Sequence, residues 1–231
     1  MAQGIAQIRR SVLTLALPVT VSSLLQRAEG IVAVFLVGGL GAVPIAAVGL
    51  GQLLAFIATT LVSGLSVGSN VVMAQLWGAR RYDDAGHAAR HFLGLSILIA
   101  LGLLSFGLLV NRLAMEMLGA QADVIRLALP YSNLIFLLIP FTILLQVLSS
   151  ILQGTGDTKT PMYAMIVVNL LHIAIAIPLI YGHWGLPALG INGAAIAVGI
   201  AEATGCLYLF TRCRPMLGGS HRFRFDLIRT I

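Results

Sequence analysis

Five long stretches of the chain contain no Asp, Glu, Lys or Arg, and they constrain its structure more than any other feature. These stretches are 11–26, 30–79, 91–111, 127–156 and 160–201. A helix crosses the hydrocarbon core of a bilayer with about 20 apolar residues, so the second and the fifth stretch are each long enough to cross twice. Glycine and proline residues near 38–44 and 182–190 provide the necessary turns. The pattern predicts an all-α, polytopic membrane bundle of six transmembrane helices.

The composition agrees with a chain that folds in lipid. Hydrophobic residues make up 58% of it and charged residues 10%, whereas soluble domains average about 45–50% and about 25%. A soluble globular domain is excluded, and so is intrinsic disorder, which requires few apolar residues and many charges. We expect the helices at 12–37, 45–76, 91–110, 127–153, 161–181 and 191–211.

The basic residues predict the orientation of the bundle. With six crossings, 11 of the 14 Lys and Arg residues fall on the side of the N-terminus, two fall on the other side, and Arg27 lies within a span. Because basic loops stay in the cytoplasm, we expect a multi-pass inner-membrane protein with both termini cytoplasmic. The net charge of +6 then reflects topology and contact with anionic membrane lipids, and nucleic-acid binding is not expected.

Small residues at four-residue spacing predict where helices pack closely, since close backbone approach stabilises helix pairs in lipid. Gly64 and Gly68 have this spacing in the second helix. In the sixth helix the same spacing links Gly193, Ala197, Ala201 and Gly205. We interpret both sets as packing faces.

The sequence contains no recognisable catalytic motif, so an enzyme is not expected. It contains no Gly-x-Ser-x-Gly, P-loop or Cys-x-x-Cys motif. His87 and His91, with Asp83 and Asp84 just before them, are the one group that resembles a metal-binding histidine cluster, but the other histidines are scattered. We therefore expect neither a bound metal nor a cofactor.

Three sequence blocks carry a resemblance to a known family. They read LLQRAEGIVAVFLVGGLG at 24–41 with AAVG at 46–49, LQGTGDTKTPM at 152–162 and GINGAAIA at 190–197. In this order and at these helix positions, they resemble the multidrug and toxic compound extrusion (MATE) family. LALP at 15–18, which includes Pro18, also fits it.

The resemblance implies an exporter built from two pseudo-symmetric six-helix lobes, which exchanges inflowing H⁺ or Na⁺ for small amphipathic or cationic substrates such as drugs or metabolites. Residues 1–214 correspond to one such lobe, and 215–231 to a cytoplasmic linker toward a second lobe. We expect that second lobe to be a missing C-terminal half, or a second copy of the chain in a homodimer. Two alternatives stay open, namely a lipid-linked sugar flippase of the same superfamily and a non-transporting membrane subunit or fragment.

The residues that usually form the family's cation site in this lobe are largely replaced. The resemblance places Ala33 where the first helix commonly carries an aspartate, His172 and Ala176 where the fifth carries an asparagine and an aspartate, and Val198 where the sixth carries a threonine. Either this lobe does not bind the coupling cation, or the site has moved by one helical turn. Glu29 precedes Ala33 by four residues, and His172 precedes Ala176 by four residues. Residues four apart lie on the same helix face, one turn from each other. If the site has moved to Glu29 and His172, it has therefore moved by one turn in the same direction along both helices.

Ionisable residues within a span are costly and need a partner or a function. We hypothesise that Glu29 carries the proton, that His172 tunes it, and that Gln26 and Asn169 provide polar contacts. The competing interpretation makes Arg27 and Glu29 purely structural. Arg27 and Glu202 would then be the better ion pair, because both are expected near mid-membrane.

Overall fold

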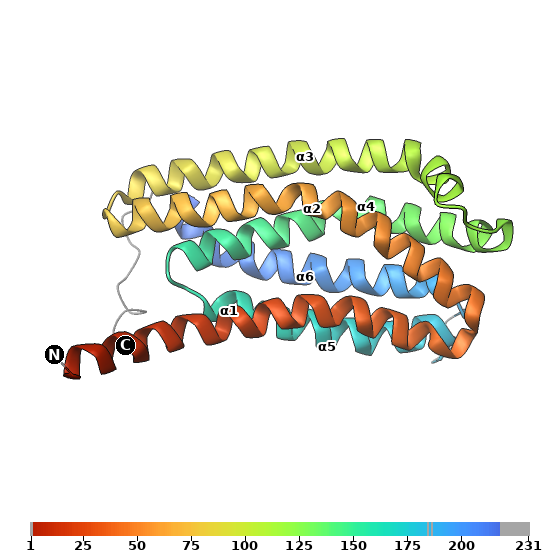
Figure 1. The fold of residues 1–231 in the computed structure, drawn as a ribbon, viewed down its shortest axis with the longest axis horizontal. Helices are drawn as coiled ribbons and strands as arrows, with labels where there is room; N and C mark the ends of the chain where they lie inside the picture. The colour runs from red at the N-terminus through yellow and green to blue at the C-terminus, as the bar shows by residue number, and fades with distance from the viewer. Residues whose placement is uncertain (1, 184, 186, 218–231) are drawn as a thin grey trace.

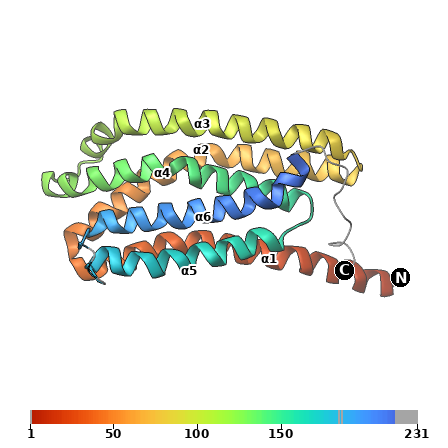
Figure 2. The same cartoon turned by 180° about the vertical axis from the view of Figure 1, so that it is seen from behind.

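Six long α-helices account for most of the chain in the computed structural model, which describes residues 2–183, 185 and 187–217. The helices are α1 (Ala2–Val37), α2 (Ala42–Gly78), α3 (Tyr82–Met117), α4 (Ala122–Gly154), α5 (Lys159–Tyr181) and α6 (Ile191–Leu217), with a 3-10 turn, η1 (Gly38–Leu40), between α1 and α2. All six are long and apolar enough to cross a membrane. Successive helices run in opposite directions along the bundle (Figure 1, and from behind in Figure 2), so the predicted six-helix architecture is confirmed.

The helices extend beyond the limits predicted from the charge-free stretches. The clearest case is α3, which was expected at 91–110 and runs from Tyr82 to Met117. Charge-free stretches mark the hydrocarbon crossing, whereas the hydrogen-bonded helix continues into the headgroup region, where Asp83 and Arg112 remain solvated. α6 likewise continues to Leu217, three residues past the expected end of the lobe, and the rest of the expected linker lies outside the described residues.

Glycines make the two turns within the long apolar stretches, as predicted. Gly41 adopts a φ of 108° just before α2, a conformation that residues with a Cβ rarely adopt. Gly182 ends α5 with a φ of 74°. Two backbone hydrogen bonds then hold the start of α6 against the end of α5, from Leu189 N to Leu179 O at 2.9 Å and from Gly190 N to Ile180 O at 3.3 Å.

The small residues of α6 allow it to pack closely in the bundle. A Cβ added to Gly193 would lie 2.6 Å from the carbonyl oxygen of Leu179 in α5, and Ala197 and Ala201 are fully buried. The predicted packing face of α6 is therefore confirmed. The prediction for Gly64 and Gly68 is wrong, because an added Cβ at either position would meet nothing within 4 Å.

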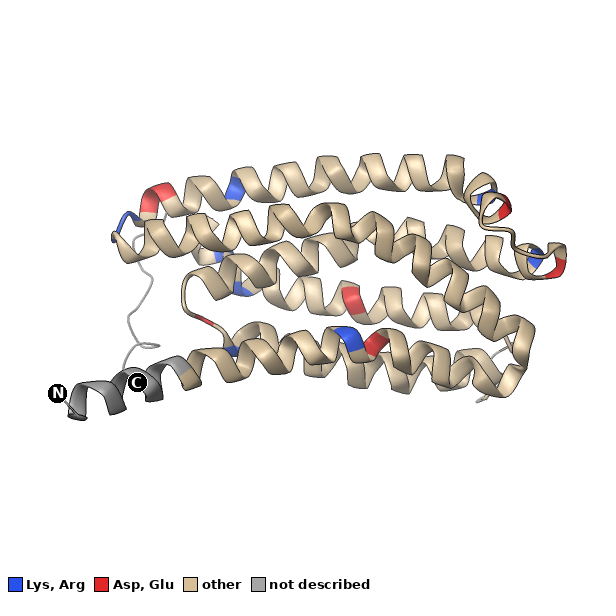
Figure 3. Ribbon diagram, in the orientation of Figure 1, with Lys and Arg blue, Asp and Glu red and all other residues tan. Residues whose placement is uncertain are grey.

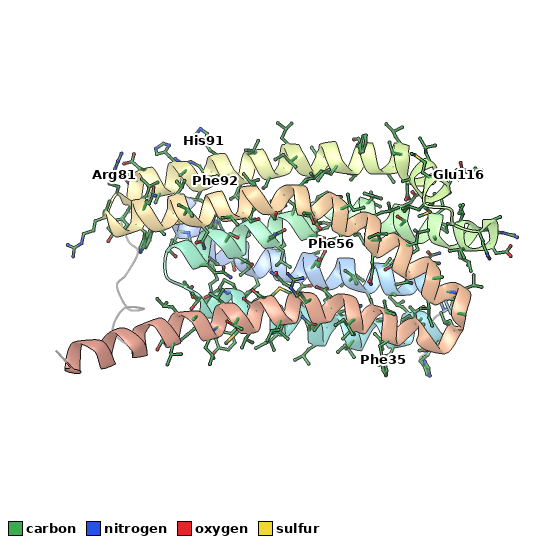
Figure 4. The ribbon with its side chains drawn as sticks, viewed as in Figure 1. Phe35, Phe56, Arg81, His91, Phe92 and Glu116 are labelled. Carbon is green, nitrogen blue, oxygen red and sulfur yellow. The ribbon has the colours of Figure 1, made fainter. Side chains whose placement is uncertain are left out.

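The outer surface of the bundle is apolar, and its charges gather at the two ends (Figure 3). Large side chains such as Phe35 and Phe56, which are 82% and 61% exposed, project outward (Figure 4). The ion pairs among the described residues lie at opposite ends, between Arg81 and Asp84 at one end and within α3 near Glu116 at the other. Charged positions in the middle of α1 and α6 are the exceptions to this distribution.

Candidate functional site

Glu202 is a buried carboxylate within α6, with 5% of its surface exposed. Its Oε2 accepts a hydrogen bond of 2.6 Å from the hydroxyl of Thr142 in α4. Gly199 and Gly205 have no side chain, so α6 packs directly against Leu138 and Leu145 of α4. This close approach brings the Glu202 carboxylate within reach of Thr142.

Glu29 of α1 faces the same region. Its Oε1 is buried and has no hydrogen-bond partner, and its carboxylate lies close enough to that of Glu202 for the two to interact electrostatically. Two neighbouring carboxylates in a medium of low dielectric constant repel each other strongly when both are ionised. Protonation of one of the two carboxylates removes that repulsion.

Arg27 does not pair with Glu202, so the predicted ion pair between them is wrong. Among the residues whose side chains are described, Arg27 forms no ion pair at all, and it lies on the exposed face of α1. Positions two apart in a helix point roughly 200° away from each other. With Glu29 directed toward α6, Arg27 is directed away from the helix bundle, which also excludes a direct pair with Glu29.

His172 is completely buried in α5, and neither ring nitrogen has a hydrogen-bond partner. The hypothesised contact between His172 and Glu29 is not formed in this structure. The positions that the family resemblance marks for aspartates, Ala33 and Ala176, are buried as well, with 3% and 0% exposed. At these two positions methyl groups stand where the resemblance expects carboxylates.

The two remaining candidates, Asn169 and Gln26, form no hydrogen bond to Glu29 or His172 among the described residues. Asn169 donates hydrogen bonds from its Nδ2 to the backbone oxygens of Met165, at 2.9 Å, and of Leu25, at 3.3 Å, so it joins α5 to α1. Gln26 lies on an exposed face of α1 and lines a separate cleft. The six predicted residues therefore do not converge, and Glu29 with Glu202 is the one pair among them whose side chains interact.

That cleft has a volume of about 740 Å³ and lies between α1, α2 and α4, next to the α4–α5 loop. Its polar lining was missed in the sequence, apart from Gln26. The lining consists of Leu15, Ala16, Val19, Thr20, Ser22, Ser23, Gln26, Ser63, Ser66, Val67, Asn70, Gln146, Ser149, Ser150, Gln153, Gly156 and Thr158. A sequence pattern could have indicated this lining. Polar residues recur three or four positions apart on three apolar helices, and residues at that spacing share one helix face.

The histidine cluster at the start of α3 has ordinary local contacts. His87 Nδ1 lies 2.9 Å from an Arg90 guanidinium nitrogen, and His91 Nδ1 lies 2.8 Å from the backbone oxygen of His87. Within the described ranges, no group of three or more His, Cys, Asp or Glu side chains is placed to hold a metal ion.

Comparison with known proteins places this architecture in a family. The MatE family model matches residues 18–177. The chain is 30% identical over 218 residues to "Probable multidrug resistance protein YoeA" of Bacillus subtilis (strain 168), covering 94% of this chain and 46% of that protein. It is 29% identical over 190 residues to "Multidrug resistance protein MdtK" of Yersinia enterocolitica, covering 82% of this chain and 42% of that protein.

A solved structure agrees in fold as well as in sequence. The crystal structure of MATE in the bent conformation superposes with a TM-score of 0.79 at 26% identity, over 87% of this chain and 44% of that one. The chain thus spans somewhat less than half the length of the curated relatives it matches. From the family match over most of its six-helix bundle, we conclude that the chain belongs to the MATE family of membrane transporters.

Proposed function

We propose that the chain forms one lobe of an exporter for amphipathic or cationic solutes, and that a second six-helix lobe completes the pathway. The names of the multidrug resistance relatives support the cargo class, and the half-length match supports the need for another lobe. Transporters built from repeats bind their substrate at the interface between the repeats. The second lobe is either the other half of a longer protein or a second copy of this chain.

The proposed orientation has both termini in the cytoplasm of a cell with this bundle in its inner membrane. The end of the bundle that holds the start of α1 also holds Arg80, Arg81, Lys159 and Arg214, whereas the opposite end holds fewer basic residues (Figure 3). Basic residues concentrate on the cytoplasmic side of membrane proteins. The polar cleft then opens toward the cytoplasm, from which an exporter takes its cargo.

We assign coupling to the two carboxylates of Glu29 and Glu202, which lie within electrostatic range of each other, and the proposed mechanism depends on this pair. It lies within the apolar part of the bundle, one carboxylate oxygen lacks a partner, and the nearest basic side chain on α1, Arg27, points away. A bound H⁺ or Na⁺ reduces the charge of the pair from −2 to −1, which weakens the repulsion and favours close packing of α1 on α6. Release of the cation restores the repulsion and favours their separation, which gives the cation a differential affinity for two conformations.

His172 has a proposed role in the second conformation. Buried polar groups in proteins are almost always hydrogen-bonded, yet both of its ring nitrogens lack a partner in this structure. A shift of α1 along α5 that carries Glu29 to His172 would give the Glu29 carboxyl group and the His172 ring each a hydrogen-bond partner. His172 is then the acceptor of the Glu29 proton during the transport cycle.

Ethidium export by bacteria that lack their own drug exporters tests this function. Cells that express the chain are loaded with ethidium, and the loss of fluorescence is followed after energisation. We expect Glu29→Gln and Glu202→Gln to abolish export, because a carboxamide cannot take up or release the coupling cation. In proteoliposomes, imposing a pH gradient or a Na⁺ gradient separately identifies the ion.

Glu116→Gln is the matched control, because Glu116 is an exposed glutamate at the end of α3 that pairs with Arg112. This variant should export ethidium at the unaltered rate. Export by the Glu29 and Glu202 variants at that same rate would refute coupling at this pair. Absence of ethidium export by the unaltered chain, both alone and together with a second lobe, would refute the exporter function itself.

A further inference from the structure

Arg27 is a basic residue near the middle of a membrane-spanning helix, and it faces outward. The neighbouring helix gives its depth, because Asn169 Nδ2 in α5 donates a hydrogen bond to Leu25 O in α1 at 3.3 Å. Asn169 lies ten residues from the start of α5 at Lys159 and twelve from its end at Tyr181, which at a helical rise of about 1.5 Å per residue is about 15 Å and about 18 Å. Arg27 follows Leu25 by two residues and therefore lies close to the centre of the membrane.

The Arg27 guanidinium has no partner among the residues that the structure describes, where it forms neither an ion pair nor a side-chain hydrogen bond. Nearby exposed hydroxyls differ in this respect. Thr20 Oγ1 donates to Ala16 O at 2.9 Å, and Ser63 Oγ donates to Thr60 O at 2.6 Å. Bonds within a helix make hydroxyls tolerable in lipid, whereas a guanidinium keeps its charge and five N–H donors. Such a group within a membrane needs an opposite charge.

The surface around Arg27 is polar. Thr20, Ser23 and Arg27 are exposed and share one face of α1, because they are three and four residues apart. Thr20 and Ser23 line the cleft between α1 and α2, which the exposed Ser63 of α2 also lines. We call Thr20, Ser23, Arg27 and Ser63 the α1–α2 face. α1 is also the least buried span, with 17% of an 18-residue stretch buried against 50% in α6, so this face has room for a partner.

A second copy of this chain does not provide the missing counter-charge. In a two-fold dimer formed through the α1–α2 face, the same surface of both copies meets, so two Arg27 guanidinium groups would lie at the same depth and repel each other. The acidic residues within the apolar part of the described bundle are Glu29 and Glu202. Glu202 is buried, and Glu29 is directed toward it with a buried Oε1. The other acidic residues that the structure describes lie at the ends of the bundle (Figure 3).

We propose that the α1–α2 face is the docking surface for a second six-helix lobe that is not identical to this chain and that presents a carboxylate to Arg27 in the middle of the membrane. This inference rests on the two-lobe architecture of the proposed function, and it selects the non-identical lobe over the second copy. A guanidinium and a carboxylate form two parallel hydrogen bonds of defined geometry. The pair therefore fixes the depth and register at which the two lobes meet.

Association of labelled chains in liposomes tests this surface, with the Arg27→Glu variant as a substitute for the partner lobe. A two-fold arrangement of the variant and the unaltered chain places the introduced carboxylate opposite Arg27 at the same depth. Donor-labelled and acceptor-labelled chains are mixed at low protein density, and energy transfer reports the dissociation constant. We expect the mixed pair to associate at least about tenfold more tightly than either chain with itself.

Arg112→Glu is the matched control, because Arg112 is an exposed arginine near the end of α3. Mixed with the unaltered chain, it should associate no more tightly than the unaltered chain does with itself. Arg27→Lys should associate with the Arg27→Glu variant, because it keeps the positive charge, whereas Arg27→Gln should not. Thermal unfolding shows whether each variant is folded, and Arg27→Asp provides a second carboxylate variant should Arg27→Glu melt early.

Two results would overturn the proposal. The first is a mixed pair of folded chains that associates no more tightly than the Arg112→Glu control pair. The second is an unaltered chain that dimerises with itself as tightly as the mixed pair, since the face would then accept a second copy. The assay measures no transport, so its outcome is separate from that of the export function. Glu29→Gln should associate with the Arg27→Glu variant as the unaltered chain does, even when it exports nothing.

Discussion

The hydrogen bond from Thr142 to Glu202 gives the sharpest prediction of stability. Replacing Thr142 with valine keeps the shape of the side chain and removes the hydroxyl that lies 2.6 Å from Glu202 Oε2. Glu202 is 5% exposed, so water does not readily replace the lost donor. A hydrogen bond to a carboxyl group contributes about 1–3 kcal/mol, and leaving a buried acceptor unpaired costs a similar amount. We take about 2 kcal/mol as the expected loss of unfolding free energy.

For a chain of this length, 1 kcal/mol corresponds to a shift of about 2–4 °C in Tm. Thr142→Val should therefore lower the Tm of the purified chain by about 4–8 °C, measured by intrinsic fluorescence during heating. Thr204→Val is the control, because the Thr204 hydroxyl is exposed and bonds within its own helix to Ile200 O at 2.8 Å. If Thr142→Val melted no more than about 1 °C below the unaltered chain, the buried hydrogen bond would contribute little and the geometry assigned to Glu202 would be refuted.

Three other predictions follow from packing and helix ends, each measured as a change in Tm. Gly193→Val should destabilise the chain by at least about 1–3 kcal/mol, since its Cβ would lie 2.6 Å from a backbone oxygen of α5, whereas Gly64→Ala, which meets open space, should stabilise it by about 0.5–1 kcal/mol. Asn169→Ala removes the hydrogen bond that joins α5 to α1, so it should cost about 1–2 kcal/mol and speed hydrogen exchange in α1. Asp157→Ala should cost about 0.5–2 kcal/mol because the carboxylate caps the start of α5, and Asp157→Asn should retain most of that stability. Unchanged Tm values for Gly193→Val or Asp157→Ala would contradict the packing or the capping contact, respectively.

The six helices could be predicted from the sequence because charged residues are unfavourable in hydrocarbon, so the segments that cross the membrane are largely free of them. The helix ends could not, since hydrogen bonding continues through the headgroup region irrespective of charge, as in α3. The start of α5, which the sequence predicted at residue 161, shows a similar limit. In the structure Asp157 accepts both Thr160 donors, and the helix begins at Lys159.

The candidate site was only half predictable from the sequence. Glu29 and Glu202 stand out because a buried charge needs a reason, but their pairing depends on how α1 is rotated about its axis against α6. No short-range pattern fixes that rotation, so the sequence favoured Arg27 as the neighbour of Glu202 and did not predict the pair that Glu202 forms with Glu29. The cleft was readable in principle, because Ser66 and Asn70 share one face of an otherwise apolar helix, but two such faces meet only when α2 packs on α4.

Infrared spectroscopy of the glutamate carboxyl groups tests the central claim most directly. The chain contains three glutamates, at positions 29, 116 and 202, so labelling with ¹³C-glutamate isolates their signals. If Glu29 and Glu202 share a cation, either a protonated-carboxyl band or a Na⁺-sensitive carboxylate band should be present in the unaltered chain. That band should be lost in both Glu29→Gln and Glu202→Gln and retained in Glu116→Gln. Carboxylate bands that respond neither to pH nor to Na⁺, or that change in one of the two variants alone, would show that the residues do not bind a cation together.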